Sequence, residues 1–268
     1  MTGYIKQHSS TLEFLSGNSW VILNPIEKRI KEKIERVGTP LKDWDISINY
    51  GIKTGCNEAF IIDKTKRDEL IAKNKKSAEI IHPILRGRDI KRYGYEFAEQ
   101  YIIATFPSRK YDIDDYPAVR DYLLKYGKQK LEQSGKPGAR KKTSHKWFET
   151  QDPIAYWDDF SKQKIFYPDI TERLSFCISD EEIYCNNTAY FLVSNTENLE
   201  YILMYLNSDL INWYYKTLSV QLGETAVRMF SIYVLNIPIP KNGDEDIFRS
   251  YKLTKNEIEF ILSISYNS

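Results

Sequence analysis

Asn-Tyr-Gly-Ile-Lys-Thr-Gly-Cys-Asn-Glu-Ala-Phe-Ile-Ile, residues 49–62, separates two apolar patterns. Apolar residues alternate over 46–50 and fill 60–62, so the stretch predicts a strand, a tight loop and a second strand. Gly51 and Gly55, in the part that we call the opening loop (residues 50–57), permit a backbone close to a partner. The same loop holds donors suited to phosphates or base edges, namely Lys53, Thr54 and Asn57. The alternative is a plain hairpin with a solvated lysine.

A second motif, Leu85-Arg86-Gly87-Arg88-Asp89-Ile90, echoes the opening stretch. Together the two motifs resemble the TaqI-like C-terminal specificity domain, which is the DNA target-recognition part of restriction-modification enzymes fused to an adenine methyltransferase. The resemblance spans residues 46–240 in the family's order. It continues through Trp147-Phe148-Glu149, Lys164-Ile165-Phe166-Tyr167-Pro168-Asp169-Ile170, Tyr205-Leu206-Asn207-Ser208 and Ile237-Pro238-Ile239-Pro240.

The resemblance implies a mixed α/β (α+β) fold like that of target-recognition domains, with a short mixed or antiparallel sheet, packed helices, and flanking helices at both ends. It implies a sequence-specific DNA-binding module that directs an adenine-N6 methyltransferase or endonuclease lying N-terminal to it. The expected partners are double-stranded DNA and that catalytic domain. S-adenosylmethionine would serve the parent enzyme, with Mg²⁺ if it also cuts DNA, and no cofactor is expected in this chain. The alternatives are a structural or protein-interaction module without DNA contact and, third, a free-standing enzyme.

Composition sets broad limits on these functions. With 268 residues and 42% hydrophobic residues, the chain can bury a core as one large domain or two small ones. A net charge of +1 gives no indication of a nucleic-acid partner, so that case depends on the distribution of charge. No apolar run reaches the length of a membrane span, which predicts a soluble, cytoplasmic protein. Three widely spaced cysteines predict free thiols and no zinc site.

Helix signals at both ends predict three segments: a lead-in helical segment (1–45), the recognition domain (46–240) and a helical tail (241–268). Asn24, Pro25 and Glu27 are typical of a helix start, and a helix over 24–37 follows. If the family's order holds, Met1 lies inside a longer protein. Thr254 and Glu257 form a capping box for a helix over 254–265.

Within the middle segment, apolar periodicity predicts the remaining elements. Pro238 and Pro240 lack the donors of a central strand and indicate a domain exit. The expected elements are short helices at 68–74 and 77–82, a strand at 101–106, a helix from 116, a turn of helix at 154–160, a meander of strands at 164–167, 174–178, 183–185 and 189–193, a long helix over 197–216, and a strand at 231–235.

Residues 125–146, which we call the basic arm, hold eight Lys or Arg side chains against a single acid, Glu132, with Gly135, Pro137 and Gly138 in the middle. Such a loop is typical of a phosphate-contacting segment, although a charge run is more often only a solvated face. The two densest basic clusters give the phosphate-binding candidates, which are Arg86, Arg88, Lys91, Arg92, Arg140, Lys141, Lys142 and Lys146.

Base reading in the major groove favours Arg or Lys on guanine and Asn or Gln on adenine. Side chains of suitable types in predicted loops give the base-reading candidates, which are Lys53, Thr54, Asn57, His145, Asn186, Asn187, Gln221 and Arg228. For Asn186 and Asn187 the alternative is strong, because paired asparagines commonly just form a turn.

Catalytic motifs are missing from the sequence. It has neither a Gly-rich loop for a methyl donor nor the Asp/Asn-Pro-Pro-aromatic motif that holds a target amine, and no carboxylate cluster with a lysine suits a metal-dependent nuclease. We therefore expect no catalytic residue and no metal site, and we expect that the isolated chain neither methylates nor cuts DNA.

Overall fold

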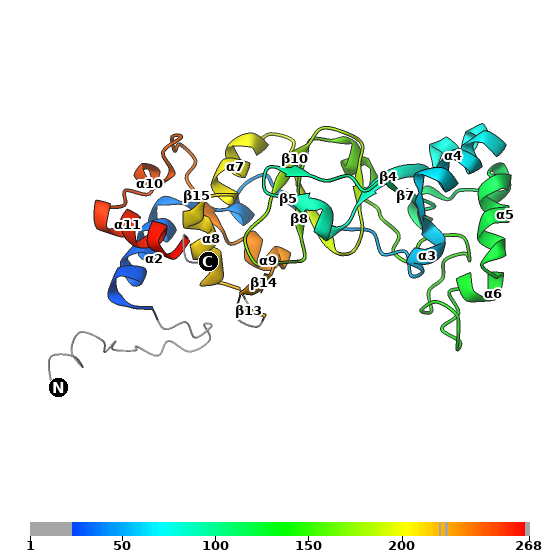
Figure 1. Cartoon of the computed structure of the whole chain (residues 1–268), viewed down its shortest axis with the longest axis horizontal. Helices are drawn as coiled ribbons and strands as arrows, with labels where there is room; N and C mark the ends of the chain where they lie inside the picture. Colours follow the sequence, from blue (N-terminus) through cyan, green and yellow to red (C-terminus); the bar gives the residue numbers. More distant parts are fainter. Residues whose placement is uncertain (1–22, 220, 223–224, 266–268) are drawn as a thin grey trace. The chain divides into compact units, whose positions relative to one another are not determined.

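The computed structural model describes residues 23–219, 221–222 and 225–265, and its residues group into two compact units (Figure 1). The first unit holds the described residues of 23–46, 171–174 and 196–265, and the second unit holds residues 47–170 and 175–195. The expected segment 46–240 is therefore divided between the two units, because the described residues from 196 onward belong to the same unit as the lead-in helix. Mixed α/β architecture, with flanking helices at both ends of the sequence, is confirmed.

Two four-stranded sheets form the frame of the second unit, in the orders β10-β8-β12-β2 and β11-β4-β7-β3. All pairings in them are antiparallel except the parallel pairing of β11 with β4. A short hairpin, β5-β6, completes the strands of this unit. The strands are β2 (Ser47–Tyr50), β3 (Ile61–Asp63), β4 (Ile81–Leu85), β5 (Ile90–Lys91), β6 (Gly94–Tyr95), β7 (Gln100–Ile103), β8 (Lys164–Pro168), β10 (Cys177–Ser179), β11 (Tyr184–Cys185) and β12 (Ala189–Val193).

Aromatic side chains fill the core between these strands. Phe160 stacks on Tyr184 with ring centroids 4.3 Å apart and lies 4.5 Å from the ring of Phe191. Every residue of β8 is buried, so its side chains contribute to packing on both faces. Much of the aromatic content of the sequence thus serves the core.

Helices cover a second core in the same unit, where Phe60, Val119, Leu123 and Leu131 are fully buried. Helices α4 and α5 lie side by side (Figure 1). Pro117 occupies the first turn of α5, as the sequence indicates. The helical elements are α3 (Asn57–Phe60), α4 (Lys64–Lys73), α5 (Pro117–Lys125), α6 (Lys128–Leu131) and the 3₁₀ turns η2 (Lys75–Glu79), η3 (Gly87–Asp89), η4 (Pro107–Arg109), η5 (Ile113–Asp115) and η6 (Trp157–Ser161).

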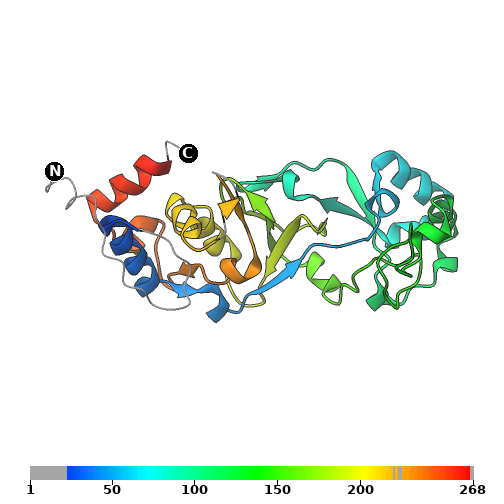
Figure 2. The same ribbon diagram turned by 90° about the horizontal axis from the view of Figure 1, so that it is seen from below.

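The first unit is mainly helical. Asn24 and Glu27 form a capping box at the start of α2, and the ammonium group of Lys33 bonds the carboxylate of Glu257 at 2.6 Å, which joins α2 to α11. Figure 2 shows these two helices as the blue and the red ribbon. No helix among the described residues is long and apolar enough to cross a membrane. The elements are α2 (Pro25–Val37), β1 (Thr39–Pro40), η1 (Leu41–Asp43), α7 (Leu199–Leu206), α8 (Asp209–Lys216), β13 (Gln221–Leu222), β14 (Ala226–Arg228), α9 (Ser231–Val234), β15 (Pro238–Ile239), α10 (Ile247–Ser250) and α11 (Lys255–Ser265), and β9 (Ile170–Thr171) lies at the sequence boundary with the second unit.

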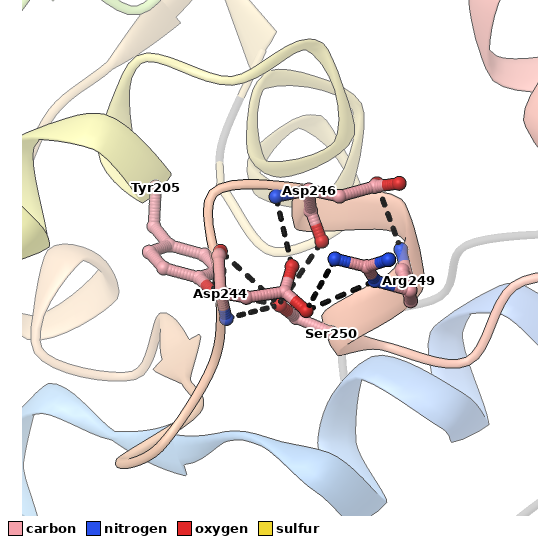
Figure 3. A network of polar contacts seen from close by, with 5 residues as sticks. All are labelled: Tyr205, Asp244, Asp246, Arg249 and Ser250. Atoms are coloured by element: carbon pink, nitrogen blue, oxygen red, sulfur yellow. Dashed lines mark hydrogen bonds and ion pairs between the residues drawn. The ribbon is translucent and has the colours of Figure 1, made fainter.

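A polar network attaches the segment after β15 to α7 (Figure 3). The hydroxyl of Tyr205 donates to Ser250 Oγ at 3.0 Å, and that Oγ accepts from the backbone N–H of Asp244 at 2.9 Å. Asp244 also accepts from Arg249 Nε at 2.9 Å, while Asp246 caps α10. Because each hydroxyl serves more than one partner, the network fixes the loop that leads into α10.

The opening stretch is not a hairpin. Its first strand, β2, pairs with β12, and its second strand, β3, pairs with β7 in the other sheet. The turn of helix α3 separates the two strands. The local apolar pattern located both strands, but it contains no information on which distant strand each one meets.

Four further predictions of local structure were wrong. Residues 77–82 divide between η2 and β4, and β11 leaves the expected meander to pair with β4. The helix over 197–216 breaks at Asn207–Ser208, where Ser208 accepts from Ile211 N and so caps α8. Residues 231–234 form a helix in place of a strand. The first three errors fall where strand pairing or a helix cap overrides short-range periodicity.

Lys164, the first residue of β8, is fully buried, and its ammonium group donates to the carbonyl oxygens of Lys162 at 2.9 Å and Glu181 at 2.7 Å. Burial lowers the pKa of Lys164 from an ordinary value of 10.5 to about 8. Between these two pH values the unfolded chain binds more protons than the folded chain, so the free energy of unfolding rises with pH.

We expect the free energy of unfolding of the wild-type chain to rise, relative to that of Lys164→Met, by about 1 kcal/mol per pH unit between pH 8 and 10. Urea unfolding of both proteins across this range measures the difference. Tyrosines and thiols titrate in both proteins, so their contributions to the free energy of unfolding cancel in the comparison. A difference that stays constant with pH would contradict the depressed pKa.

Candidate nucleic-acid interface

The opening loop lies against the turn that joins β11 to β12. Ile52 donates its N–H to Cys185 O at 2.8 Å, and its carbonyl accepts from Asn187 N at 3.0 Å. A Cβ on Gly51 would stand 1.9 Å from the carbonyl oxygen of Asn186. Gly51 therefore allows another backbone to approach closely, as the sequence indicates. That backbone is a distant segment of the same chain and not an external partner.

Asn186 forms this turn with its side chain. The side-chain carbonyl accepts from the N–H of Thr188 at 3.1 Å and from its hydroxyl at 2.6 Å, and Asn186 is 5% exposed. Asn186 thus forms a turn, which was the alternative interpretation. The prediction that Asn186 reads a base is corrected. Asn187 is half-buried, and its carbonyl accepts from the hydroxyl of Tyr50.

The Arg-Gly-Arg-Asp motif packs on the same turn. Gly87 donates its N–H to Thr188 Oγ1 at 2.7 Å, and a Cβ on Gly87 would meet Thr188 O at 2.3 Å. Arg86 holds the carboxylate of Asp89 through Nε at 2.9 Å and Nη2 at 2.7 Å. Burial, the largest single influence, raises the pKa of Asp89, yet the bonds from Arg86 hold that pKa below its ordinary value. The geometry makes Arg86 a structural ion pair and corrects its prediction as a phosphate ligand.

The remaining cations of this motif differ in exposure. Arg88 and Lys91 are exposed, and the ammonium group of Lys91 donates to Arg88 O at 3.0 Å and lies 3.7 Å from the carboxylate of Glu96. Arg92 is half-buried, with its guanidinium 5.4 Å from the ring centroid of Tyr93. Arg88 and Lys91 thus keep the accessibility that a phosphate contact needs.

On its other side, the opening loop is bonded to residues 151–152, just after the basic arm. Lys53 O accepts from Asp152 N at 3.2 Å, and Thr54 O accepts from Gln151 N at 3.2 Å. Thr54 is fully buried, and its hydroxyl donates to the side chain of Asn57 at 2.7 Å, so its prediction as a base-reading residue is corrected. Lys53 and Asn57 are exposed.

Arg140 is the structural centre of the basic arm. It is 5% exposed, and its guanidinium donates to four carbonyl oxygens at 2.7 to 2.8 Å. Burial lowers the pKa of Arg140 to about 10, which leaves it charged at neutral pH. Its prediction as a phosphate ligand is corrected, because the donors are directed at the chain. The acceptors are the carbonyls of Thr54, Leu131, Trp147 and Glu149.

Around this buried arginine the lysines of the basic arm are exposed. His145 is half-buried and its Nδ1 lies 3.0 Å from Gln151 O, so the imidazole is held beside the opening loop. Lys146 keeps its ammonium group in solvent while its backbone N–H donates to Glu149 Oε2 at 2.6 Å. The exposed lysines are Lys125, Lys128, Lys130, Lys136, Lys141, Lys142 and Lys146.

Two candidates belong to the first unit. Arg228 lies on β14, not in a loop, with its guanidinium 5.5 Å from the ring centroid of Phe230. Gln221 belongs to β13, and its side chain lies outside the described residues. The other fourteen candidates lie in the second unit.

Sequence reasoning missed Asp152. It considered acidic residues only as nuclease ligands, and no acidic residue was among the base-reading candidates. The available signal was an aspartate six residues after the last lysine of the basic arm, because Asp is also a base-reading type for cytosine. The structure places Asp152 beside Lys53, at the junction of opening loop and arm.

Comparisons with known proteins agree on one kind of domain. The model of the TaqI-like C-terminal specificity domain matches residues 82–239. The structure of the type IIL restriction-modification enzyme MmeI in complex with DNA is similar at a TM-score of 0.50 and 16% identity, over 74% of this chain and 25% of that chain. The crystal structure of the type IIG restriction endonuclease BpuSI is similar at a TM-score of 0.52 and 16% identity, over 88% of this chain and 27% of that chain.

At these identities the two structures show a shared fold. This chain spans 25% and 27% of the length of those two proteins. No curated protein matches the sequence.

Proposed function

The chain belongs to the family of TaqI-like C-terminal specificity domains, and from this premise we propose that it is the sequence-specific DNA-binding module of a restriction-modification enzyme. In this proposal it directs an adenine-N6 methyltransferase or an endonuclease that precedes it in the parent protein. The chemistry of that partner requires S-adenosylmethionine, with Mg²⁺ for cleavage. This chain contributes recognition, because its sequence lacks the motifs for methyl transfer and for cleavage.

The basic arm is the single observation that carries the proposal. A buried guanidinium holds four backbone carbonyls in place, so the backbone of the loop is fixed while its lysines face solvent. A run of charges that is only solvated does not need a buried arginine to order its backbone. Ammonium groups carried on an ordered backbone suit phosphates, because neutralised phosphates release counterions and so drive binding.

The burial pattern divides the proposed contacts into two classes. Phosphates are contacted by exposed cations, and base edges by polar side chains. The phosphate class contains Arg88, Lys91, Lys141, Lys142 and Lys146, with half-buried Arg92 at its margin, and the base-reading class contains Lys53, Asn57, His145 and Asn187 from the second unit, with Gln221 and Arg228 from the first.

We expect the double variant Lys141→Gln with Lys142→Gln to bind every DNA sequence more weakly and to lower the salt slope by about 2, because each lost phosphate contact removes about 0.9 from that slope. Fluorescence anisotropy titrations of a labelled duplex at several salt concentrations measure it. The matched control is Lys66→Gln with Lys73→Gln, which removes the same charge from α4, where both lysines pair with Glu69.

The control double variant should keep the wild-type slope. If both double variants lower the slope equally, net charge and not the arm governs binding. If neither changes it, the arm is a solvated face and a protein-interaction role gains support.

A further inference from the structure

Asp152 has a fixed backbone and an uncommitted carboxylate. Its N–H donates to Lys53 O at 3.2 Å, and its carbonyl accepts from the hydroxyl of Thr150 at 2.9 Å. Among the described residues, its carboxylate makes no hydrogen bond and no ion pair. Its position is therefore determined by the fold while its acceptor capacity stays unused.

Two of the neighbouring segments carry cations: the backbone N–H of Asp152 donates to Lys53 O, and the imidazole of His145 lies 3.0 Å from the carbonyl of the preceding residue, Gln151. Burial raises the pKa of Asp152, and the charges of Lys53, His145 and Lys141 oppose that shift, in decreasing order. These three residues come from the opening loop and from two points of the basic arm. All three are proposed here to lie at the DNA, so the carboxylate stands inside the proposed interface and not at its edge.

An acid in this place conflicts with phosphate binding, because like charges repel across a short distance. A carboxylate can only accept hydrogen bonds. In the major groove the donors are the N4 amino group of cytosine and the N6 amino group of adenine. Adenine presents the N7 acceptor beside its N6 group, which would repel a carboxylate, whereas cytosine presents only the donor. The chemistry favours cytosine.

We propose that Asp152 is a specificity-determining residue that accepts a hydrogen bond from the N4 amino group of one cytosine, while Lys53, His145 and Lys141 offset its charge against the phosphates. This inference rests on the proposed DNA-binding function. The repulsion of Asp152 by every phosphate is the same for all sequences, so only the cytosine contact adds preference.

The test begins with selection of a preferred duplex by the wild-type chain. Asp152→Ala is expected to lose about 5- to 150-fold of the preference for cytosine at one base pair, the range for one base contact. On DNA without that site the variant should bind as well as the wild type or better, because a repulsive charge is gone. Asp158→Ala, at an exposed acid of the second unit, is the control and should leave the preference unchanged.

An atomic probe identifies the contact. Replacing each cytosine of the selected site in turn by 2-pyrimidinone removes only its N4 amino group. At the position read by Asp152 the wild type should lose affinity, and Asp152→Ala should lose nothing further. Thermal melting of the variants establishes that they are folded.

The outcomes separate the two proposals. If the wild-type chain binds no DNA, the proposed function fails and this inference with it. If the wild type selects a site but Asp152→Ala keeps the same preference, or loses affinity equally on every sequence, the inference alone is overturned.

Discussion

Gly51→Ala and Gly87→Ala are each expected to destabilise the chain by about 3 kcal/mol or more, the upper range for forced overpacking, or to prevent folding. A Cβ at Gly51 would stand 1.9 Å from Asn186 O and 2.8 Å from Ala189 O. At Gly87 it would stand 2.3 Å from Thr188 O. These are backbone atoms of one turn, so no rotamer change relieves the overlap.

Gly94→Ala is the matched control for both variants. A Cβ at Gly94 meets no atom within 4 Å, so the change is expected to stay within about 0.5 kcal/mol. Urea denaturation midpoints of the three variants measure the difference. Equal stability of Gly51→Ala and Gly94→Ala would show that the turn of residues 185–188 does not lie against the opening loop.

Arg140→Met is expected to cost several kcal/mol, because each buried acceptor left without its donor costs about 1–3 kcal/mol. Four carbonyl oxygens lose their donor, and three of them belong to the basic arm and the residues just after it. Arg140→Lys should recover little of this, because one ammonium group cannot reproduce the planar fork of a guanidinium. Lys142→Met, at an exposed position, is the control.

Limited trypsin digestion adds a local readout to the unfolding measurement. With its frame removed, the lysine-rich arm of Arg140→Lys should be cut faster than that of the wild type, because cleavage follows the population of the open form. The same variant should bind all DNA sequences more weakly, since its phosphate contacts depend on an ordered arm. An arm equally resistant in wild type and variant would contradict the role of Arg140.

The sequence by itself determined the features that depend on neighbouring residues. The capping box of α2, the Pro117 start of α5 and the position of β12 all follow from patterns within a few residues. Ordered motifs over 46–240 also indicated the family, because several motifs at suitable spacing are more specific than one. Local patterns carry this information since capping and helical periodicity act over one or two turns.

Only the tertiary structure decided which polar side chains stay accessible. Arg140 and Lys141 are adjacent cations in sequence, yet the first is buried among carbonyls and the second is exposed. Asp152 acquires its setting from Lys53, a hundred positions earlier. The physical reason is that burial and strand pairing join segments far apart in the chain. Those distant contacts decide which hydrogen-bond partners a buried side chain has. Residue type predicted a basic surface, and packing selected which of its members can reach a partner.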